Sequence, residues 1–291
     1  MTQPQNILVT HGNCPDGAAA AVVLSKVRPD LEVVFGQHTQ INDQVFKAGQ
    51  ILAEGGSLFL ADICGDPPVI HNLQESLKEK NAGLYIYEHH QSRSYLSELQ
   101  QPKDLRGEIV FDLRRCGSKI LFDALSANHP ELSVYSEFVE LTNDRDLWLN
   151  RDARSVHLVK LHNILGDAGY IARFKNNPSV VLTEKESIIL EYQSRKDQEK
   201  IDKLLEKIEV KVDDIGLRYG VVFGEGDSSE MLHQAIEKND LEYAIHINLN
   251  SKKGSIRSRG NFDCAAFAEK RGGGGHKAAS GFPVRFDRPR F

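Results

Sequence analysis

The chain has 291 residues, of which 40% are hydrophobic and 26% are charged. This is the balance of an ordinary globular protein, and the length allows two domains. No stretch approaches the roughly 20 apolar residues that span a bilayer, and the first residues lack the order of a secretory signal. Its four cysteines are scattered without a Cys-x-x-Cys pair, so we expect reduced thiols, a cytoplasmic location and no membrane partner. The formal net charge of −5 argues against binding long duplex DNA.

The first part of the chain alternates between strand-like and helix-like segments. Apolar runs typical of buried strands lie at Asn6–Thr10, Leu31–Phe35, Ser57–Ala61 and Gly83–Tyr87, and helical stretches lie at Asp16–Lys26 and Val69–Lys80. Strands that alternate with helices predict a parallel sheet with helices on both faces. Beyond residue 112 the pattern is helical, over Gly117–Ala127, Ser133–Thr142, Ala153–Leu165 and Tyr170–Phe174. Residues 1–182 are therefore predicted to form an α/β domain.

The second part begins with a long charged segment, Thr183–Glu209, whose apolar residues recur largely at helical spacing. Thr183 and Glu186 fit a capping box at its start, and we interpret residues 183–209 as a linker helix. Residues 210–291 then show strand-like runs at Leu217–Phe223, Tyr243–Leu249, Gly254–Arg257 and Gly281–Arg285, with a helix near Ser229–Lys238. This pattern predicts a smaller α+β domain.

Residues that can bind metal ions stand where the predicted strands end. His11 and Asp16 lie in the turn after the first strand, and Asp62 follows the third. The segment Glu88-His89-His90 follows the fourth. Ligands bind at this edge of an open α/β sheet. Each motif alone also has an ordinary explanation, such as Asp16 acting as a helix N-cap.

A fourth motif, Asn143-Asp144-Arg145-Asp146, comes after a predicted helix. Its ordinary explanation is a charged loop anchored by the only tryptophan, Trp148. Together the four motifs offer at least three carboxylates and two or three imidazoles. That inventory suits two divalent ions that share a bridging carboxylate and activate water for displacement at phosphorus.

The segment Arg271–Lys277 contains four consecutive glycines followed by His276. The backbone N–H groups of such a run can approach an anion closely, and Arg257 and His276 could then hold a phosphate. A flexible linker is a weaker explanation, because another strand-like run follows. The basic residues around this segment suit a short anionic ligand, although a solvated surface explains the charge equally well.

The order of these five motifs resembles the DHH family of phosphoesterases over nearly the whole chain. The four N-terminal motifs match the DHH domain. The glycine-rich histidine motif matches the DHH-associated domain of RecJ-type exonucleases and nanoRNases, and His-Gly-Asn-Cys-Pro-Asp-Gly and Asp-Arg-Asp-Leu-Trp resemble the oligoribonuclease-like branch. The resemblance implies a DHH domain over 1–182 and a DHH-associated domain over 210–291.

The resemblance also implies roles for individual residues. The metal ligands, usually around two Mn²⁺ ions, would be His11, Asp16, Asp62, His89 and Asp144. Asp62 would bridge the ions, and His90 would act with it in catalysis. The substrate's terminal phosphate or sugar would be bound by Arg257, Gly273, Gly274, Gly275 and His276.

Two residues depart from the family pattern. Cys14 stands where many members have an acid, and a thiolate ligand would favour Zn²⁺ or Fe over Mn²⁺ or Mg²⁺. Alternatively Cys14 does not bind metal, because a small residue in this turn also satisfies packing. Glu88 stands where the family name expects Asp, and we expect it to support the histidines without binding metal.

The function favoured by the sequence is hydrolysis of very short single-stranded RNA or DNA oligonucleotides, or of dinucleotides such as pApA, to mononucleotides. Two other enzymatic hypotheses stay open: a phosphatase for a nucleoside bisphosphate such as pAp, and a hydrolase of cyclic or linear dinucleotides. A hypothesis of another class is a nucleotide-binding module whose catalytic activity is weakened. A homodimer is one possible assembly. Structural or surface roles are predicted for His157, His162, His233 and His246.

Overall fold

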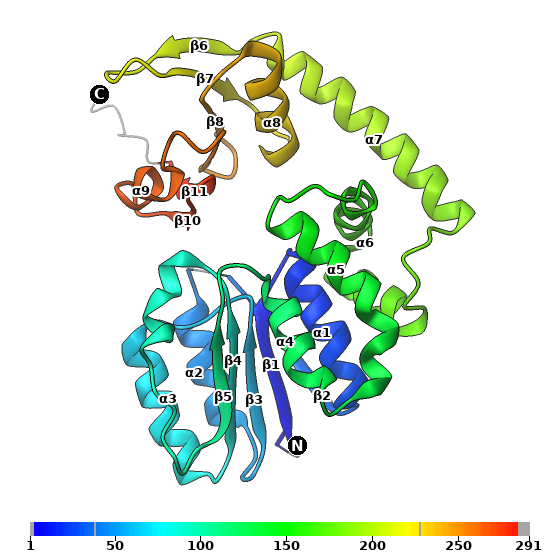
Figure 1. The fold of residues 1–291 in the computed structure, drawn as a ribbon, viewed down its shortest axis with the longest axis vertical. Coiled ribbons are helices and arrows are strands. Elements are labelled where there is room, and N and C mark those ends of the chain that lie inside the picture. Colours follow the sequence, from blue (N-terminus) through cyan, green and yellow to red (C-terminus); the bar gives the residue numbers. More distant parts are fainter. Residues whose placement is uncertain (1–2, 38, 227, 285–291) are drawn as a thin grey trace. The chain divides into compact units, whose positions relative to one another are not determined.

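The computed structural model describes residues 3–37, 39–226 and 228–284. The chain divides into two compact units, Met1–Leu190 and Glu191–Phe291, each with its own sheet (Figure 1). The division falls inside helix α7 (Glu184–Leu205), within the segment predicted to be a linker helix. No helix in the described part of the chain combines the length and apolar content needed to cross a membrane.

The first unit contains a five-stranded parallel sheet with the order β2-β1-β3-β4-β5. Its strands are β1 (Asn6–His11), β2 (Leu31–Gly36), β3 (Ser57–Ala61), β4 (Gly83–Glu88) and β5 (Arg106–Phe111). The middle strands are near-continuous apolar runs, because helices cover both faces of the sheet and neither set of side chains meets water. The predicted parallel sheet is confirmed.

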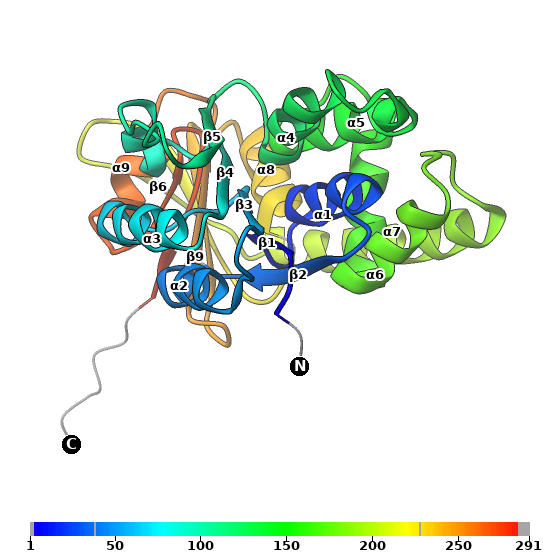
Figure 2. The ribbon, with the colours of Figure 1, turned by 90° about the horizontal axis from the view of Figure 1, so that it is seen from below.

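Two separate cores lie on the two faces of this sheet. Figure 2 shows the helices that cover these faces. One face is covered by α2 (Ile41–Ile51) and α3 (Pro67–Glu79). The other is covered by α1 (Pro15–Val27) and α4 (Gly117–Ser126), with α5 (Ser136–Asp146) and α6 (Arg154–Asn176) packed behind them. The short 3₁₀ helices are η1 (Gln91–Ser97) and η2 (Pro130–Tyr135). Helix α1 is central to its core, since every residue from 18 to 24 is fully buried.

Several elements of the first unit differ from the sequence prediction. Strand β5 and helix α2 are absent from the prediction. Strand β5 lies at the edge of the sheet and none of its residues is fully buried, so it lacks the long apolar run of the inner strands. Helix α5 continues to Asp146, so the acidic motif predicted as a loop is helical. The two helices predicted between residues 153 and 174 form α6, which turns sharply at Gly166 (φ +65°).

The second unit has a six-stranded sheet with the order β10-β11-β9-β8-β7-β6. Its strands are β6 (Glu209–Val212), β7 (Arg218–Phe223), β8 (Tyr243–Asn248), β9 (Lys253–Ser258), β10 (Gly274–His276) and β11 (Ala279–Pro283), and its helices are α8 (Ser228–Asn239) and α9 (Cys264–Glu269). All neighbouring strands are antiparallel except β7 and β8. The smaller α+β unit is confirmed, and Arg285 of the predicted last strand lies outside the described residues.

Helix α7 begins with the predicted capping box. The Thr183 N–H donates to Glu186 Oε2 (2.7 Å), and the Glu186 N–H donates to Thr183 Oγ1 (3.3 Å). The helix ends earlier than predicted, at Leu205, because residues from Glu209 onward pair with β7 as an edge strand.

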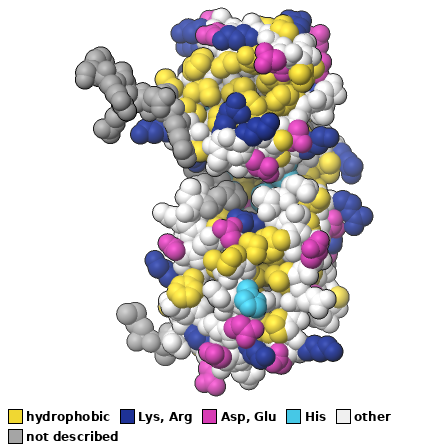
Figure 3. All heavy atoms as spheres, turned by 90° about the vertical axis from the view of Figure 1, so that its left-hand side faces the viewer, with side chains coloured by type: hydrophobic (Ala, Val, Ile, Leu, Met, Phe, Trp, Pro, Cys, Tyr) yellow, Lys and Arg dark blue, Asp and Glu magenta, His cyan; other side chains and the backbone are white. Residues whose placement is uncertain are grey.

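Apolar side chains gather on the upper part of the face drawn in Figure 3, which belongs to the second unit. Large hydrophobic residues of this unit that are exposed include Val210, Val212 and Ile215, in β6 and the turn after it. The free edge of this sheet is therefore partly apolar.

Candidate metal centre

The carboxyl ends of β1, β3 and β4 bring the first three motifs to one edge of the sheet. These strands pair in register, with Thr10 opposite Ala61 and Ala61 opposite Tyr87. The next residues along the chain therefore emerge side by side. They include His11, Asp62 and Glu88, as expected for the ligand-binding edge of a parallel sheet.

Asp62 lies at the middle of this edge and is almost fully buried. Its Oδ1 lies 3.1 Å from His89 Nε2, and its Oδ2 lies 3.7 Å from His11 Nδ1. Burial disfavours the carboxylate, yet the imidazoles of His11 and His89 hold the pKa of Asp62 well below its usual range. The backbone of Asp62 is left-handed (φ +61°), a conformation that non-glycine residues rarely adopt outside functional sites and turns.

Gly117 at the start of α4 packs directly on the Asp62 backbone. A Cβ at this position would lie 2.5 Å from Asp62 N and 2.7 Å from Asp62 Cα, closer than atoms can approach. Glycine is therefore required for α4 to reach the sheet edge.

Asp16 connects the first turn of α1 to the N-terminus of α4. Its carboxylate accepts the backbone N–H groups of Gly117 (2.7 Å) and Ser118 (2.9 Å). Burial, followed by the charges of Asp62 and Asp146, raises the pKa of Asp16 to about 7. Asp16 is not the N-cap of its own helix, because that position is Cys14.

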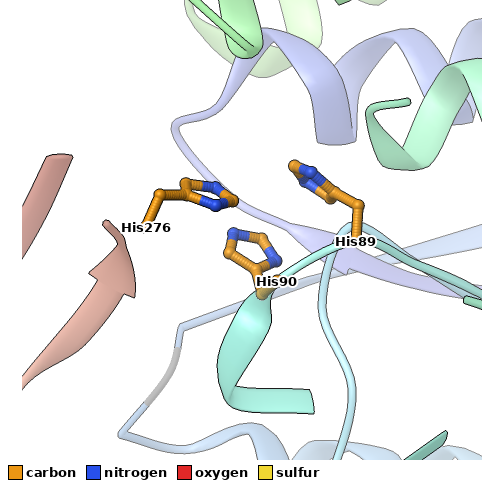
Figure 4. A group of neighbouring side chains, drawn as sticks. All are labelled: His89, His90 and His276. Atoms are coloured by element: carbon orange, nitrogen blue, oxygen red, sulfur yellow. The ribbon is translucent and has the colours of Figure 1, made fainter. Parts of the chain in front are cut away.

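Glu88 organises the two histidines that follow it. Its Oε1 accepts the backbone N–H groups of His89 (2.7 Å) and His90 (3.0 Å) and lies 2.7 Å from His90 Nδ1. Burial opposes ionisation, but His90 outweighs it and lowers the pKa of Glu88 to about 2. Figure 4 shows the rings of His89 and His90 side by side at the end of β4, with centroids 4.4 Å apart. His276, also drawn there, belongs to β10 in the second unit.

The fourth motif brings Asp146 to the histidines, and it does not bring the predicted ligand Asp144 there. Asp146 Oδ2 lies 3.6 Å from His89 Nε2. The Asp144 carboxylate instead accepts the backbone N–H groups of Arg151 (2.9 Å) and Asp152 (3.3 Å), and so holds the loop after α5. Residues two apart on a helix point in nearly opposite directions, so only one of these acids can face the sheet.

Helical spacing in this motif indicates which acid faces the sheet. Val139, Asn143 and Asp146 follow one another at spacings of four and three, which places them on one helix face. Val139 is fully buried, and Asn143 Oδ1 accepts the Cys116 N–H (2.8 Å). The face that carries Asp146 is thus the inward one.

Six side chains form two groups of candidate metal ligands: His11, Cys14 and Asp62 in one, and Asp16, His89 and Asp146 in the other. Within each group the donor atoms lie within 4.8 Å of one another. Burial and the charge of Asp62 raise the pKa of the Cys14 thiol well above its usual range, so a cation is needed to ionise it.

The carboxylates of this cluster fit a bound cation. Among the described residues, neither Asp62 Oδ2 nor Asp146 Oδ2 has a hydrogen-bond partner, although both oxygens are buried. A buried carboxylate oxygen without a partner is costly, and three carboxylates close together repel one another. Divalent ions bound to oxygen and imidazole donors would satisfy these oxygens and remove the repulsion.

The loop between β1 and α1 is held by residues that the sequence prediction missed. Gln37 Nε2 donates to the Gly12 carbonyl (3.0 Å), and the Asn13 N–H donates to Asp167 Oδ2 (3.0 Å). Asp167 also lies 2.7 Å from His162 Nε2, so His162 has the structural role predicted for it. Asp167 follows the turn at Gly166, and no local pattern relates it to residue 13.

In the second unit, Arg257 and His276 lie on strands that flank β11. Arg257 pairs with Ala279 from one side, and His276 pairs with Ala279 from the other. Directly paired residues share a face of a sheet, so both side chains project from the same face with only the Ala279 methyl group between them. Arg257 also donates to Ser229 Oγ (2.8 Å) in the first turn of α8.

The glycine run of this unit has a packing role in the β10–β11 hairpin. A Cβ on Gly273 would lie 2.1 Å from the Gly281 carbonyl oxygen, and Gly275 has a left-handed backbone (φ +142°). Gly274 has open space at its Cβ position. Two of the three glycines predicted to bind substrate are thus required by the hairpin, and their substrate role stays a prediction.

No protein-family model matches this sequence, and no curated protein matches it. Among solved structures, RecJ from Thermus thermophilus, in complex with Mn²⁺, aligns with 97% of this chain (TM-score 0.60, 17% identity). The chain spans 50% of that RecJ chain. The pGpG-specific phosphodiesterase PggH from Vibrio cholerae aligns with 97% of this chain and 94% of its own (TM-score 0.57, 12% identity).

The DHH domain of a member of a family of ribosomal proteins aligns with 97% of this chain and 83% of its own (TM-score 0.62, 11% identity). At these identities the likeness establishes the fold. The expected fold, a parallel sheet with helices on both faces followed by a smaller α+β unit, is confirmed.

Proposed function

We propose that the chain is a DHH-family phosphoesterase that hydrolyses very short oligonucleotides, or linear dinucleotides, to mononucleotides. The observation that carries this proposal is the cluster of buried carboxylates and imidazoles at the carboxyl edge of a DHH-type sheet, in which two carboxylate oxygens have no hydrogen-bond partner among the described residues. Carboxylate and imidazole donors can hold two divalent ions, and a two-metal centre can promote displacement at phosphorus.

Two divalent ions, with Mn²⁺ at one or both positions, would be held by the two donor groups, and Asp62 would be shared between them. When bound, they would supply an activated water and stabilise the charge that develops on the phosphate. Asp16 and Glu88 keep the donors in place, because Asp16 anchors the α1 turn to α4 and Glu88 orients both histidines.

His90 is the residue proposed to act directly on the substrate. Its Nδ1 is engaged by Glu88, which sets the ring's orientation. Burial lowers the pKa of this ring, but the Glu88 carboxylate outweighs that effect and raises it. A protonated His90 would donate a hydrogen bond to a phosphoryl oxygen or a proton to the leaving oxygen.

The second unit is proposed to bind the end of the substrate. Arg257 and His276 project from one sheet face on either side of Ala279. Their backbones are two strand spacings apart, roughly 9–10 Å, which suits a single nucleotide phosphate with its sugar. A site of this size favours short substrates, and so does the net charge of −5.

A linear dinucleotide is the substrate with separate support, because the structurally similar PggH is a pGpG-specific phosphodiesterase. A phosphatase for pAp would use the same residues on a smaller ligand. A nucleotide-binding module without turnover is the alternative of another class.

Hydrolysis assays would separate these functions. The purified chain is incubated with Mn²⁺, and separately with EDTA, against pApA, pGpG, pAp, a labelled five-mer and a labelled twenty-mer. We expect Mn²⁺-dependent release of mononucleotides from the dinucleotides and the five-mer. An Asp62→Asn variant should release none, while its circular dichroism spectrum shows that it is folded. Preference for the twenty-mer would contradict the proposed substrate class. Absence of turnover with any divalent metal would favour the binding module.

A further inference from the structure

The two groups of metal ligands differ in chemistry. Asp62 belongs to the group with His11 and Cys14, and its Oδ1 also lies 3.1 Å from His89 of the other group, so it stands between the two. On the His89 side the remaining donors are two carboxylates, Asp16 and Asp146. On the His11 side the remaining donor is the sulfur of Cys14.

These donor sets favour different metal ions. Carboxylates with one imidazole form a hard site, which suits Mn²⁺ or Mg²⁺. A thiolate with an imidazole and one carboxylate is a softer set, and it favours Zn²⁺, Fe²⁺ or Co²⁺. The position bounded by Cys14 would therefore select a different ion from the position bounded by Asp16.

The sulfur of Cys14 is directed to this position by the start of α1. Cys14 is the N-cap, where Ser, Thr, Asp or Asn normally bonds to the helix, yet its side chain makes no capping hydrogen bond. The Cys14 carbonyl accepts the Ala18 N–H (3.0 Å), so the residue is held at the start of the helix, and its sulfur lies within 4.8 Å of the donor atoms of His11 and Asp62. A helix N-terminus also stabilises a thiolate.

Backbone hydrogen bonds of Gly12 and Asn13 hold the turn before Cys14. The Gly12 N–H donates to the Gly36 carbonyl (2.9 Å), and the Gly12 carbonyl accepts from Gln37. The Asn13 N–H donates to Asp167. A turn held by these three hydrogen bonds presents the Cys14 sulfur in one defined place.

An observation independent of the cysteine points to a cation on the same side. Asp62 is 1% exposed, and the oxygen of its carboxylate that faces His11 is the one without a hydrogen-bond partner among the described residues. A cation bound between His11, Cys14 and Asp62 would satisfy this oxygen.

We propose that the centre is heterometallic: Cys14, His11 and Asp62 bind Zn²⁺, Fe²⁺ or Co²⁺, while Asp16, His89 and Asp146 share Asp62 with Mn²⁺ or Mg²⁺. This inference rests on the proposed two-metal function and goes beyond it, because it assigns a different class of ion to each position. The Cys14 thiol loses its proton when the softer ion binds.

Metal content and absorption test the inference without an activity measurement. The metal-free protein is loaded with limiting Co²⁺ and then with excess Mn²⁺, and bound metals are measured by mass spectrometry after desalting. We expect about one equivalent of each ion and a near-ultraviolet thiolate-to-Co²⁺ charge-transfer band. Two equivalents of Mn²⁺ that displace Co²⁺, without such a band, would overturn the proposal.

Variants identify the sulfur. Cys14→Ser should lose the charge-transfer band. Cys14→Asp should bind two Mn²⁺ in place of one, and this binding would also show that the metal centre of that variant is folded. The matched control is Cys264→Ser, which replaces a buried cysteine of the second unit and should keep the band. A band that survives Cys14→Ser would contradict the assignment. Hydrolysis with homogeneous Mn²⁺ binding would leave the proposed function standing while this inference fails.

Discussion

The carboxylate of Asp167 accepts a 3.0 Å hydrogen bond from the backbone N–H of Asn13, 154 residues earlier in the chain. Asn13 lies between His11 and Cys14 and has a left-handed backbone (φ +56°). The contact thus stabilises an uncommon conformation in the turn that carries two proposed metal ligands. The sharp turn at Gly166 places Asp167 where it can do this.

Asp167→Ala is expected to weaken metal binding by about 10- to 100-fold, as substitutions behind metal ligands commonly do. The reason is that the Asn13 peptide loses its acceptor, so His11 and Cys14 are no longer held in the binding geometry. Calorimetric titration with Mn²⁺ and Co²⁺ would measure the effect. Asp167→Asn keeps an acceptor for this N–H and should restore most of the affinity. Equal affinities for wild type and Asp167→Ala would show that the contact has no positioning role.

Asp146→Ala and Asp144→Ala are expected to have different effects. Asp146 faces His89, so its removal should eliminate binding of one metal equivalent. Asp144 bonds to the backbone of the loop after α5, so its removal should cost about 1–3 kcal/mol of unfolding free energy while both metal equivalents remain. Metal titration together with urea unfolding separates the two. The reverse pattern would restore Asp144 as the ligand.

Metal affinity is expected to rise with pH through the neutral range. The pKa of Asp16 is raised to about 7 in the metal-free protein, so this carboxyl group carries a proton at pH 6 and has mostly lost it at pH 8. A metal must displace that proton at low pH, which weakens binding by up to about tenfold per pH unit below 7 for each proton displaced. Mn²⁺ titrations at pH 6, 7 and 8 in buffers of different ionisation enthalpy would measure both affinity and proton release. An affinity that falls as pH rises would be inconsistent with this assignment.

Gly117→Ala is expected to destabilise the first unit by about 1–3 kcal/mol, because the added methyl group overlaps the Asp62 backbone and forces α4 away from the sheet edge. The same displacement would pull the N–H donors of α4 away from Asp16 and weaken metal binding. Gly274→Ala is the control, since open space surrounds its Cβ position. Chemical unfolding and Mn²⁺ titration measure both effects. A Gly117→Ala protein as stable as the control would show that the contact can relax without cost.

Local sequence patterns were enough to predict the order of the main elements and the strand ends at which metal-binding residues occur. The buried runs of β1, β3 and β4 are apolar throughout, because both faces of the sheet are covered, and such runs are recognisable without a structure. His11, Asp62 and His89 were found because each lies at or just after the end of such a run. The capping box of Thr183 and Glu186 was likewise a local pattern.

Long-range packing selects the other residues that meet at that edge. The choice of Asp146 over Asp144 depends on α5 continuing for one more turn, and packing of the Val139 and Asn143 face decides that continuation. The bond between Asp167 and Asn13 depends on the path of α6, which no local pattern specifies. Strand β5, half exposed at the sheet edge, is defined by pairing with β4 and not by its own composition. Local residue patterns indicate which side chains are buried. These contacts arise between segments far apart in the chain, so only the folded structure reveals them.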